Sequence, residues 1–345
     1  RRVLDRLIGF FISPLADAAV NQDGREYRYT VGRVQSPALA MITDALQKRM
    51  SFEPKNAYRL RIDYDFYGTV GAAASSAFYV TALSRNTFMQ KAEAYEAAGA
   101  ARKLVHTVKS MKSLRHTVNP PRALKTSSMQ ARAFMEKGLP AAVSSQSAQS
   151  MFQRGLITYP RTDSERVSAE GKDIATRRIM DMYGEKYVGF PPDPPLGEFG
   201  QGAHEAVRPA LAKVERFRTD EEKALYGVVD KYFIASRMSP AQVNQTTVVM
   251  SCPLDEFTAQ FRTIHNDGFT RHTKDTAKLL NGYSIPPSVL RDIRPGMRVG
   301  GLNVSVVEET DHPPRVHDEA SLILACEKEG IGRPSTYPEI TKKLK

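Results

Sequence analysis

The chain has 345 residues, more than one ordinary hydrophobic core holds, so we expect two or three packed units. Hydrophobic residues make up 41% and charged residues 25%, as in globular proteins, and the lack of any run of about 18 apolar residues argues against a membrane protein. An excess of 49 Lys and Arg over 38 Asp and Glu gives a net charge of +11, which favours a polyanionic partner such as nucleic acid. Solvated surface charges would produce the same balance, and two distant cysteines exclude a disulfide framework.

Helices are predicted at the start of the chain. Residues 1–15 place apolar side chains on one helical face and charged side chains on the other. A second helix is expected from Ser36, its N-cap, with Leu39 and Leu46 directed inward. The first helix does not have the pattern of a signal peptide, so we expect the chain to begin within a larger protein.

A β-rich unit is predicted from Tyr58 to about Val80, where apolar and charged side chains alternate as in a half-buried strand. The same alternation returns at residues 246–250 and 302–307. We therefore interpret the segment of about 120–245 as an insertion between two halves of one β domain.

The inserted segment predicts helices followed by a short strand. One helix is expected from Ser127 to Lys137 with Gly138 as its stop, and residues 156–159 have the composition of a strand. Helices followed by a strand, with basic residues among them, are compatible with a winged-helix arrangement. The tail from Asp318 onward predicts helix again.

The densest polar cluster surrounds Tyr159. In an extended chain Tyr159 and Arg161 point to the same side, so the guanidinium would favour the phenolate and bind a neighbouring phosphate. A phenol with a pKa near 10 needs such help to act as a nucleophile at neutral pH. The alternative is a packed aromatic at a strand end beside a surface arginine, which a lone Tyr-Pro-Arg more often represents.

Three further segments suit anion binding. His204 and Arg208 stand four residues apart, which places them on one helical face where both would hydrogen-bond a phosphate. The alternative for His204 is a helix cap or a structural histidine. Residues 31–37, with Arg33, and 330–337, with Arg333, place glycines and an arginine at a helix start, where backbone N–H groups bind anions. Each is equally compatible with an ordinary capped loop.

The order and spacing of these motifs resemble those of type IA DNA topoisomerases of the bacterial topoisomerase I kind. The matching segments are Arg1–Arg6, Gly32–Ser36, Lys125–Gln130, Gly155–Ser164, Ala203–Pro209, Glu319–Leu322 and Gly330–Tyr337. The resemblance implies a multidomain α+β fold, a toroidal core of three domains. These are a helical DNA-binding domain (1–56 and 309–345), a β-rich arch or hinge domain (57–118 and 246–308) and a winged-helix-like domain carrying the tyrosine (119–245).

The resemblance also implies the chemistry. Tyr159 would attack a phosphodiester of single-stranded DNA and form a 5′-phosphotyrosine intermediate, followed by strand passage and religation that relax negatively supercoiled DNA without ATP. Arg161 would hold the scissile phosphate, and His204 would hydrogen-bond a phosphate near it. The residues expected to contact DNA are Arg1, Arg2, Asp5, Arg33, Gln35, Arg208, Arg315, Arg333 and Ser335.

The sequence departs from the family pattern in two places. The Toprim domain, whose acidic residues hold Mg²⁺, is expected upstream of Arg1, so no metal site is assigned in this chain. Residues 63–65, Asp-Tyr-Asp, imitate its motif but are interpreted as a strand face. The spacing from Pro313 to Ala320 is one residue longer than usual, which weakens the Arg315 assignment, and no Cys-rich zinc ribbon follows.

Two alternatives stay open. Without the Toprim domain the chain would act as a catalytically incomplete core or clamp that binds single-stranded DNA. A recombinase or type IB topoisomerase would need a His-x-x-Arg motif before a C-terminal tyrosine, whereas Tyr159 precedes His204 here. We expect a monomer with DNA as its partner and no membrane contact; a bacterial nucleoid and an organelle both fit the sequence.

Overall fold

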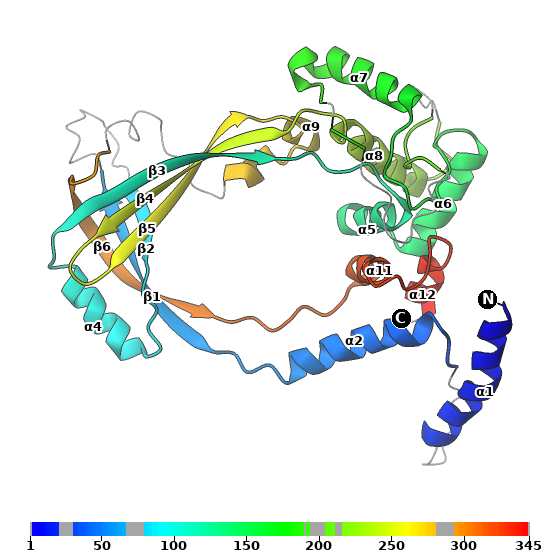
Figure 1. Ribbon diagram of the computed structural model, residues 1–345, viewed down its shortest axis with the longest axis horizontal. Helices are drawn as coiled ribbons and strands as arrows, with labels where there is room; N and C mark the ends of the chain where they lie inside the picture. Colours follow the sequence, from blue (N-terminus) through cyan, green and yellow to red (C-terminus); the bar gives the residue numbers. More distant parts are fainter. Residues whose placement is uncertain are drawn as a thin grey trace. The chain divides into compact units, whose positions relative to one another are not determined.

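The computed structural model describes residues 2–20, 30–66, 79–189, 191–193, 204–210, 216–280 and 293–343. The chain divides into two compact units, each discontinuous in sequence. Unit 1 comprises Arg1–Phe52, Pro121–Arg237 and Pro314–Lys345, and unit 2 comprises Glu53–Pro120 and Met238–Pro313. The fold is α+β with a large antiparallel sheet, as Figure 1 shows. The finer division into three domains stays a prediction.

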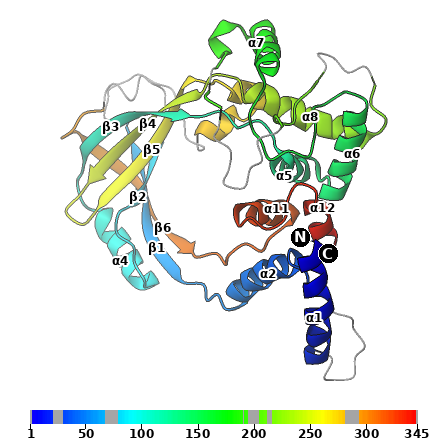
Figure 2. The same ribbon diagram turned by 45° about the vertical axis from the view of Figure 1, so that its right-hand side comes forward.

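Unit 2 is built on a closed antiparallel barrel with the strand order β1-β2-β5-β4-β3-β6. Its strands are β1 (Asn56–Asp65), β2 (Tyr79–Ser84), β3 (His106–Val118), β4 (Ala241–Ser251), β5 (Glu256–Asn266) and β6 (Arg298–Thr310). Figure 2 shows helix α4 (Lys91–Ala101) beside the barrel. The helix contacts β1 and β6, and its buried alanines belong to the barrel core. The short helices α9 (Thr270–Thr273) and η3 (Thr276–Leu280) follow β5. The strands expected near Tyr58 and at 246–250 and 302–307 are confirmed.

The barrel core follows directly from the alternation in β1. Leu60, Ile62 and Tyr64 are fully buried, while the residues between them are partly exposed. The phenol oxygen of Tyr64 lies 2.7 Å from Nδ1 of His106, and Nε2 of that ring lies 2.9 Å from the Ala101 carbonyl oxygen. Two buried polar side chains therefore satisfy each other inside an apolar core.

Unit 1 is mainly helical. Its helices are α1 (Arg2–Val20), α2 (Gln35–Met50), α5 (Thr126–Lys137), α6 (Ala141–Gln153), α7 (Ala169–Tyr183), η2 (Glu185–Tyr187), α8 (Asp220–Ala235), α11 (Glu319–Lys328) and α12 (Tyr337–Lys343). A core between α5, α6 and α8 also takes in Ile157 and Val207 from two extended segments. No helix in the described part of the chain is long and apolar enough to cross a membrane.

Several helix ends differ from the sequence prediction. Helix α5 ends at Gly138 as expected, in the left-handed conformation with φ +65°, but it begins at Thr126, so Ser127 lies inside it. Helix α2 begins at Gln35, and the Ser36 hydroxyl instead accepts a hydrogen bond from the Gly32 N–H at 3.1 Å.

The packing of the N-terminal helices also differs from expectation. Residues 1–15 were predicted as a helix, and α1 begins at Arg2 and runs on to Val20. In α2, Leu39 and Leu46 are exposed, so the prediction that they point inward is wrong. The apolar periodicity of the sequence predicted where these two helices lie in the chain, but it did not predict which face of each helix is buried.

Candidate active site

Tyr159 lies in an extended segment that follows α6. Gly155, with φ +70°, turns the chain after the helix, and Ile157 then pairs with Pro209 as an isolated β-bridge. The Thr158 N–H donates to the Arg208 carbonyl at 2.9 Å. The segment around Tyr159 is thereby joined to a segment about fifty residues further along the chain.

His204 lies directly beside Tyr159. The two ring centroids are 4.7 Å apart with a tilt of 47°, and Phe152 also contacts Tyr159, edge-on with ring centroids 5.3 Å apart. Tyr159 is half-buried and His204 is exposed. Both line an open pocket whose other lining residues are Thr158, Ser168 and Glu205. The phenol and the imidazole are therefore presented together to whatever enters this pocket.

The prediction that His204 and Arg208 share a helical face is wrong. Residues 204–210 are extended, and Val207 pairs with Leu124 in a second β-bridge. Arg208 is buried, with 4% of its surface exposed, and its Nε and one terminal nitrogen each donate to a different carboxylate oxygen of Glu205 at 2.9 Å. The guanidinium is thus held by partners within the protein, which argues against the predicted DNA contact at Arg208.

These partners favour the ionised form of Glu205. Burial alone would raise the pKa of this carboxyl, but hydrogen bonds from Arg208 and Ser168, together with the charge of Arg208, lower the pKa below its usual range. The Ser168 N–H donates to Glu205 at 3.1 Å, and the Ser168 hydroxyl caps α7 by accepting from the Gly171 N–H at 3.2 Å. The first turn of α7 is thus attached to the segment that carries His204.

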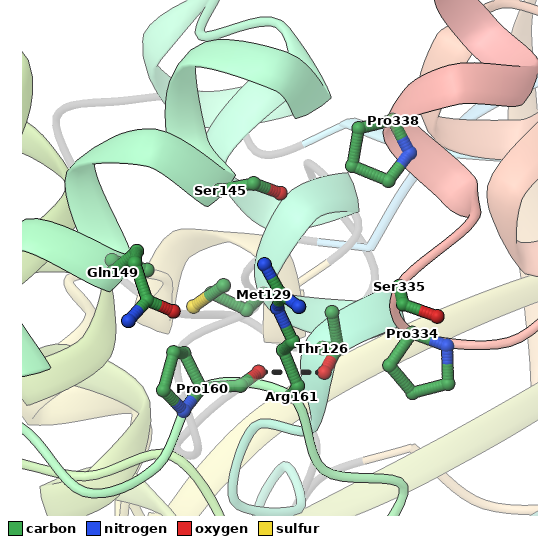
Figure 3. Close-up of a pocket in the computed structure, with 10 residues that line it drawn as sticks. Thr126, Met129, Ser145, Gln149, Pro160, Arg161, Pro334, Ser335 and Pro338 are labelled. Atoms are coloured by element: carbon green, nitrogen blue, oxygen red, sulfur yellow. Dashed lines mark hydrogen bonds between the residues drawn. The ribbon is translucent and has the colours of Figure 1, made fainter.

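Arg161 lies in a neighbouring pocket of unit 1, shown in Figure 3. The lining residues are Thr126, Met129, Ser145, Ala148, Gln149, Pro160, Arg161, Pro334, Ser335 and Pro338. The Thr126 hydroxyl donates to the Pro160 carbonyl at 2.6 Å and holds the chain just before Arg161. The pocket brings together Arg161 and Ser335, two predicted site residues that are distant in sequence.

The remaining predicted DNA contacts are scattered over unit 1. Arg33 forms an ion pair with Asp5 at 3.0 Å, and Gln35 is the first residue of α2. Arg315 is exposed just before α11, and the Arg333 N–H donates to the Thr336 hydroxyl at 2.8 Å. None of these four side chains lines either of the two pockets described above. Arg2 is the first residue of α1, and Arg1 lies outside the described residues.

Comparison with known proteins supplies the family. The family model described as DNA topoisomerase matches residues 1–345. The chain belongs to the type IA DNA topoisomerases. It is 29% identical to DNA topoisomerase 1 of Aquifex aeolicus, with all of this chain and 61% of that protein covered. It is 30% identical to DNA topoisomerase 1 of Pseudomonas aeruginosa, with 39% of that protein covered.

A solved structure agrees with this assignment. Full-length topoisomerase I from Thermotoga maritima superposes with a TM-score of 0.76 at 27% identity, covering all of this chain and 55% of that chain. This topoisomerase chain therefore spans between 39% and 61% of the length of the relatives named here.

Mg²⁺ is expected on the Toprim domain and not on the residues of this chain. The described residues contain no group of three or more His, Cys, Asp or Glu side chains able to hold a metal ion. Asp63 on β1, in the motif that imitates a metal site, accepts a hydrogen bond at 2.6 Å from the hydroxyl of Thr81 on the paired strand β2. We therefore assign no step of the topoisomerase reaction to a metal on these residues.

Sequence reasoning missed Thr158, Ser168 and Glu205, which line the Tyr159 pocket. Two of these residues flank the predicted catalytic ones, since Thr158 precedes Tyr159 and Glu205 follows His204. The positions of Thr158 and Glu205 inside the matching motifs could have indicated that these two residues belong to the site. Their hydrogen-bond partners came only from the fold.

Proposed function

We propose that this chain carries the DNA-cleaving tyrosine of a type IA topoisomerase, with Tyr159 as the nucleophile. The observation that carries the proposal is the contact between Tyr159 and His204 at an open polar pocket, within the motifs that match the family. The reaction is transient cleavage of one DNA strand, passage of another strand and religation, which relaxes negatively supercoiled DNA.

The cleavage step exchanges one phosphoester for another. The phenol oxygen of Tyr159 attacks the phosphorus, the bond from phosphorus to the 3′ oxygen breaks, and that oxygen leaves with a proton as the phenol loses one. The product is a 5′-phosphotyrosine and a free 3′-hydroxyl. Because the number of phosphoester bonds does not change, resealing reverses the step without ATP.

Arg161 and His204 supply the groups that bind phosphate. The exposed guanidinium of Arg161 suits the scissile phosphate, where it would stabilise the charge of the transition state. The imidazole of His204 would donate a hydrogen bond to a phosphate oxygen beside Tyr159. We assign the lead-in of the single strand to Arg2, Asp5, Arg33 and Gln35, and backbone contacts to Arg315, Arg333 and Ser335; Arg1 belongs to the same proposal.

Two other tyrosines of the chain are poor candidates for the nucleophile. Burial, followed by the nearby charges of Cys252 and Asp255, raises the pKa of Tyr64 far above its ordinary value. Burial and the charge of Glu327 likewise raise the pKa of Tyr337. Both phenols are buried and their raised pKa makes the phenolate harder to form, whereas Tyr159 borders the pocket.

The test replaces Tyr159 with Phe in the natural full-length protein. Loss of the nucleophile should lower plasmid relaxation by several orders of magnitude while single-stranded DNA is still bound. Tyr95→Phe, at an exposed tyrosine of α4, is the matched control and should relax plasmid normally. Relaxation by the Tyr159→Phe variant would show that Tyr159 is not the nucleophile.

The alternative of a DNA-binding core without cleavage is separated by a denaturing gel. A covalent adduct between the full-length protein and a labelled single-stranded oligonucleotide supports cleavage, and its absence supports the clamp. Either reading requires binding to phosphates, so the affinity of this chain for the oligonucleotide should fall steeply as salt concentration rises. Binding that does not respond to salt would contradict both.

A further inference from the structure

The extended segment that carries His204 is fastened to the segment that carries Tyr159 by the side chain of Thr158. Its hydroxyl accepts a hydrogen bond from the Arg208 N–H at 3.0 Å and donates one to the Ala206 carbonyl at 2.8 Å. The Thr158 N–H bonds the same segment at the Arg208 carbonyl. One residue therefore makes three hydrogen bonds to residues 204–210 immediately before Tyr159.

The ion pair between Arg208 and Glu205 holds the same segment, with the guanidinium buried and the carboxylate half-buried. The guanidinium of Arg208 engages both carboxylate oxygens of Glu205 and also donates to the Ser168 hydroxyl at 3.2 Å. Its remaining terminal nitrogen donates to the Pro209 carbonyl at 2.9 Å. Three nitrogens of the side chain thus have partners inside the protein, and Glu205 is joined to His204 by a single peptide bond.

The first turn of α7 covers this ion pair. A Cβ added to Gly171 would lie 2.7 Å from Nε of Arg208 and 2.8 Å from a methyl carbon of Val167. Only a residue without a side chain allows the helix to approach the guanidinium so closely. Arg208 is accordingly enclosed by the protein and held in one orientation.

We propose that Thr158, Glu205 and Arg208 form a positioning unit that holds His204 against Tyr159, and that Arg208 acts through Glu205 without contacting DNA. Two of the three side chains assigned to cleavage are immediate neighbours of this unit, because Tyr159 follows Thr158 and His204 precedes Glu205. This inference deepens the proposed function and rests on it. Groups that orient a reacting residue typically change activity by about 10- to 100-fold when removed.

The variants are Arg208→Met, Arg208→Lys and Thr158→Val. Methionine fills space but cannot pair with Glu205, and lysine keeps the charge but lacks the planar fork that reaches both oxygens. Valine keeps the shape of threonine without its hydroxyl. Arg178→Met is the matched control, because Arg178 makes a similar two-point ion pair with Asp230 at 2.5 and 2.8 Å on α7 and α8, apart from the lining of the Tyr159 pocket.

The first measurement is the NMR signal of the His204 ring in this chain, assigned by its loss in His204→Gln. In the wild type the ring lies within the ring-current field of Tyr159, so the positioning variants, which change how His204 lies against Tyr159, should each move its signals. At a temperature well below unfolding, where each variant is folded, Arg208→Met and Thr158→Val should shift the His204 signals. Arg178→Met should lower the unfolding temperature without shifting them. A role in stability alone would give the second result for every variant.

The second measurement compares binding with cleavage in the full-length protein. Arg208→Met and Arg208→Lys should lower formation of the covalent DNA adduct by about 10- to 100-fold and leave the affinity for single-stranded DNA within about twofold. Weaker binding with a smaller salt dependence would instead identify Arg208 as a phosphate contact and overturn the proposal. Unchanged His204 signals in Arg208→Met would overturn it as well.

A double variant tests whether Glu205 and Arg208 act as a pair. Glu205→Gln retains the size of the side chain, and combined with Arg208→Met it should be no worse than Arg208→Met alone if the two residues act as a pair. Additive losses would contradict that pairing. Cleavage that survives Tyr159→Phe would refute the proposed nucleophile, yet the His204 signals would still decide whether the positioning unit exists.

Discussion

The pair Tyr64–His106 in the barrel and the pair Tyr159–His204 at the pocket use the same two kinds of side chain. In the barrel the ring centroids are 5.4 Å apart, both residues are buried, and the phenol and imidazole hydrogen-bond at 2.7 Å. At the pocket the centroids are 4.7 Å apart, but among the described residues neither the phenol oxygen nor the imidazole has a hydrogen-bond partner. Satisfied and buried polar atoms serve stability, whereas polar atoms left open to a pocket are available to a ligand.

The surroundings of the two pairs also differ, because one is apolar and the other is polar. The barrel surrounds Tyr64 with apolar side chains, and burial raises its pKa, so that phenol stays protonated. The pocket surrounds Tyr159 with Thr158, Ser168 and Glu205. The same aromatic side chain is therefore part of the core in unit 2 and part of a candidate reaction site in unit 1.

The largest expected effect separates the two pairs by stability. Phe257 is fully buried and contacts both Tyr64 and His106, with ring centroids 6.4 and 5.5 Å away. Phe257→Ala should reduce the free energy of unfolding by about 3–5 kcal/mol through the lost contacts and the cavity left behind. His204→Ala, at an exposed position, should change it by less than about 0.5 kcal/mol. Urea unfolding measures both, and equal losses would remove the distinction between the pairs.

A smaller effect is expected where α7 covers Arg208. Gly171→Ala introduces a Cβ within 3 Å of two side chains and should destabilise the fold by about 1–3 kcal/mol while shifting the His204 NMR signals. Gly227→Ala is the control, because an added Cβ there meets nothing within 4 Å inside helix α8. That variant should be stabilised by about 0.5–1 kcal/mol. Similar behaviour of the two alanines would show that α7 does not pack tightly on the guanidinium.

The pH dependence tests the ion pair behind the pocket. Because the folded-state pKa of Glu205 is lowered, its contribution to stability is fully present above the ordinary carboxyl pKa and is lost as pH falls through the lowered value. The stability difference between wild type and Glu205→Gln should therefore shrink as pH falls from about 5 into the acid range. Glu170, 3.8 Å from Arg208, also faces the pair, so Glu170→Gln serves as the comparison. A difference that does not change with pH would mean that Glu205 is not ionised in the fold.

The smallest effect is expected at the exposed ion pair of Asp5 and Arg33. Side chains with 49% and 35% exposure are screened by water and salt, so Asp5→Asn should cost only about 0.2–1 kcal/mol. Because Asp5 and Arg33 are both assigned to the lead-in of the single strand and Asp5 orients Arg33 there, binding to a single-stranded oligonucleotide at low salt should become slightly weaker. Tighter binding would indicate that Asp5 competes with the phosphate for Arg33 and would contradict its place in the lead-in.

The fold could be predicted from the sequence where a regular pattern of apolar residues corresponds to one buried face. The alternation in β1 predicted the buried face at Leu60, Ile62 and Tyr64, and Gly138 predicted the end of α5. The start of α2 and the exposure of Leu39 could not be predicted, because a helical pattern does not specify what lies opposite it. The sequence predicted Tyr159, Arg161 and His204 as site residues, and in the structure Tyr159 and His204 are in contact.

The sequence by itself determined the family, because the order and spacing of several motifs are far more specific than any one of them. It did not determine the conformation of residues 204–210, since a spacing of four is compatible with a helical face and with an extended chain. The extended form is stabilised by β-bridges from Val207 to Leu124 and from Pro209 to Ile157. These bridges satisfy backbone groups in segments that are distant along the chain. Only the tertiary structure could bury Arg208, because helix α7 from another part of the chain covers the guanidinium while Glu205 balances its charge.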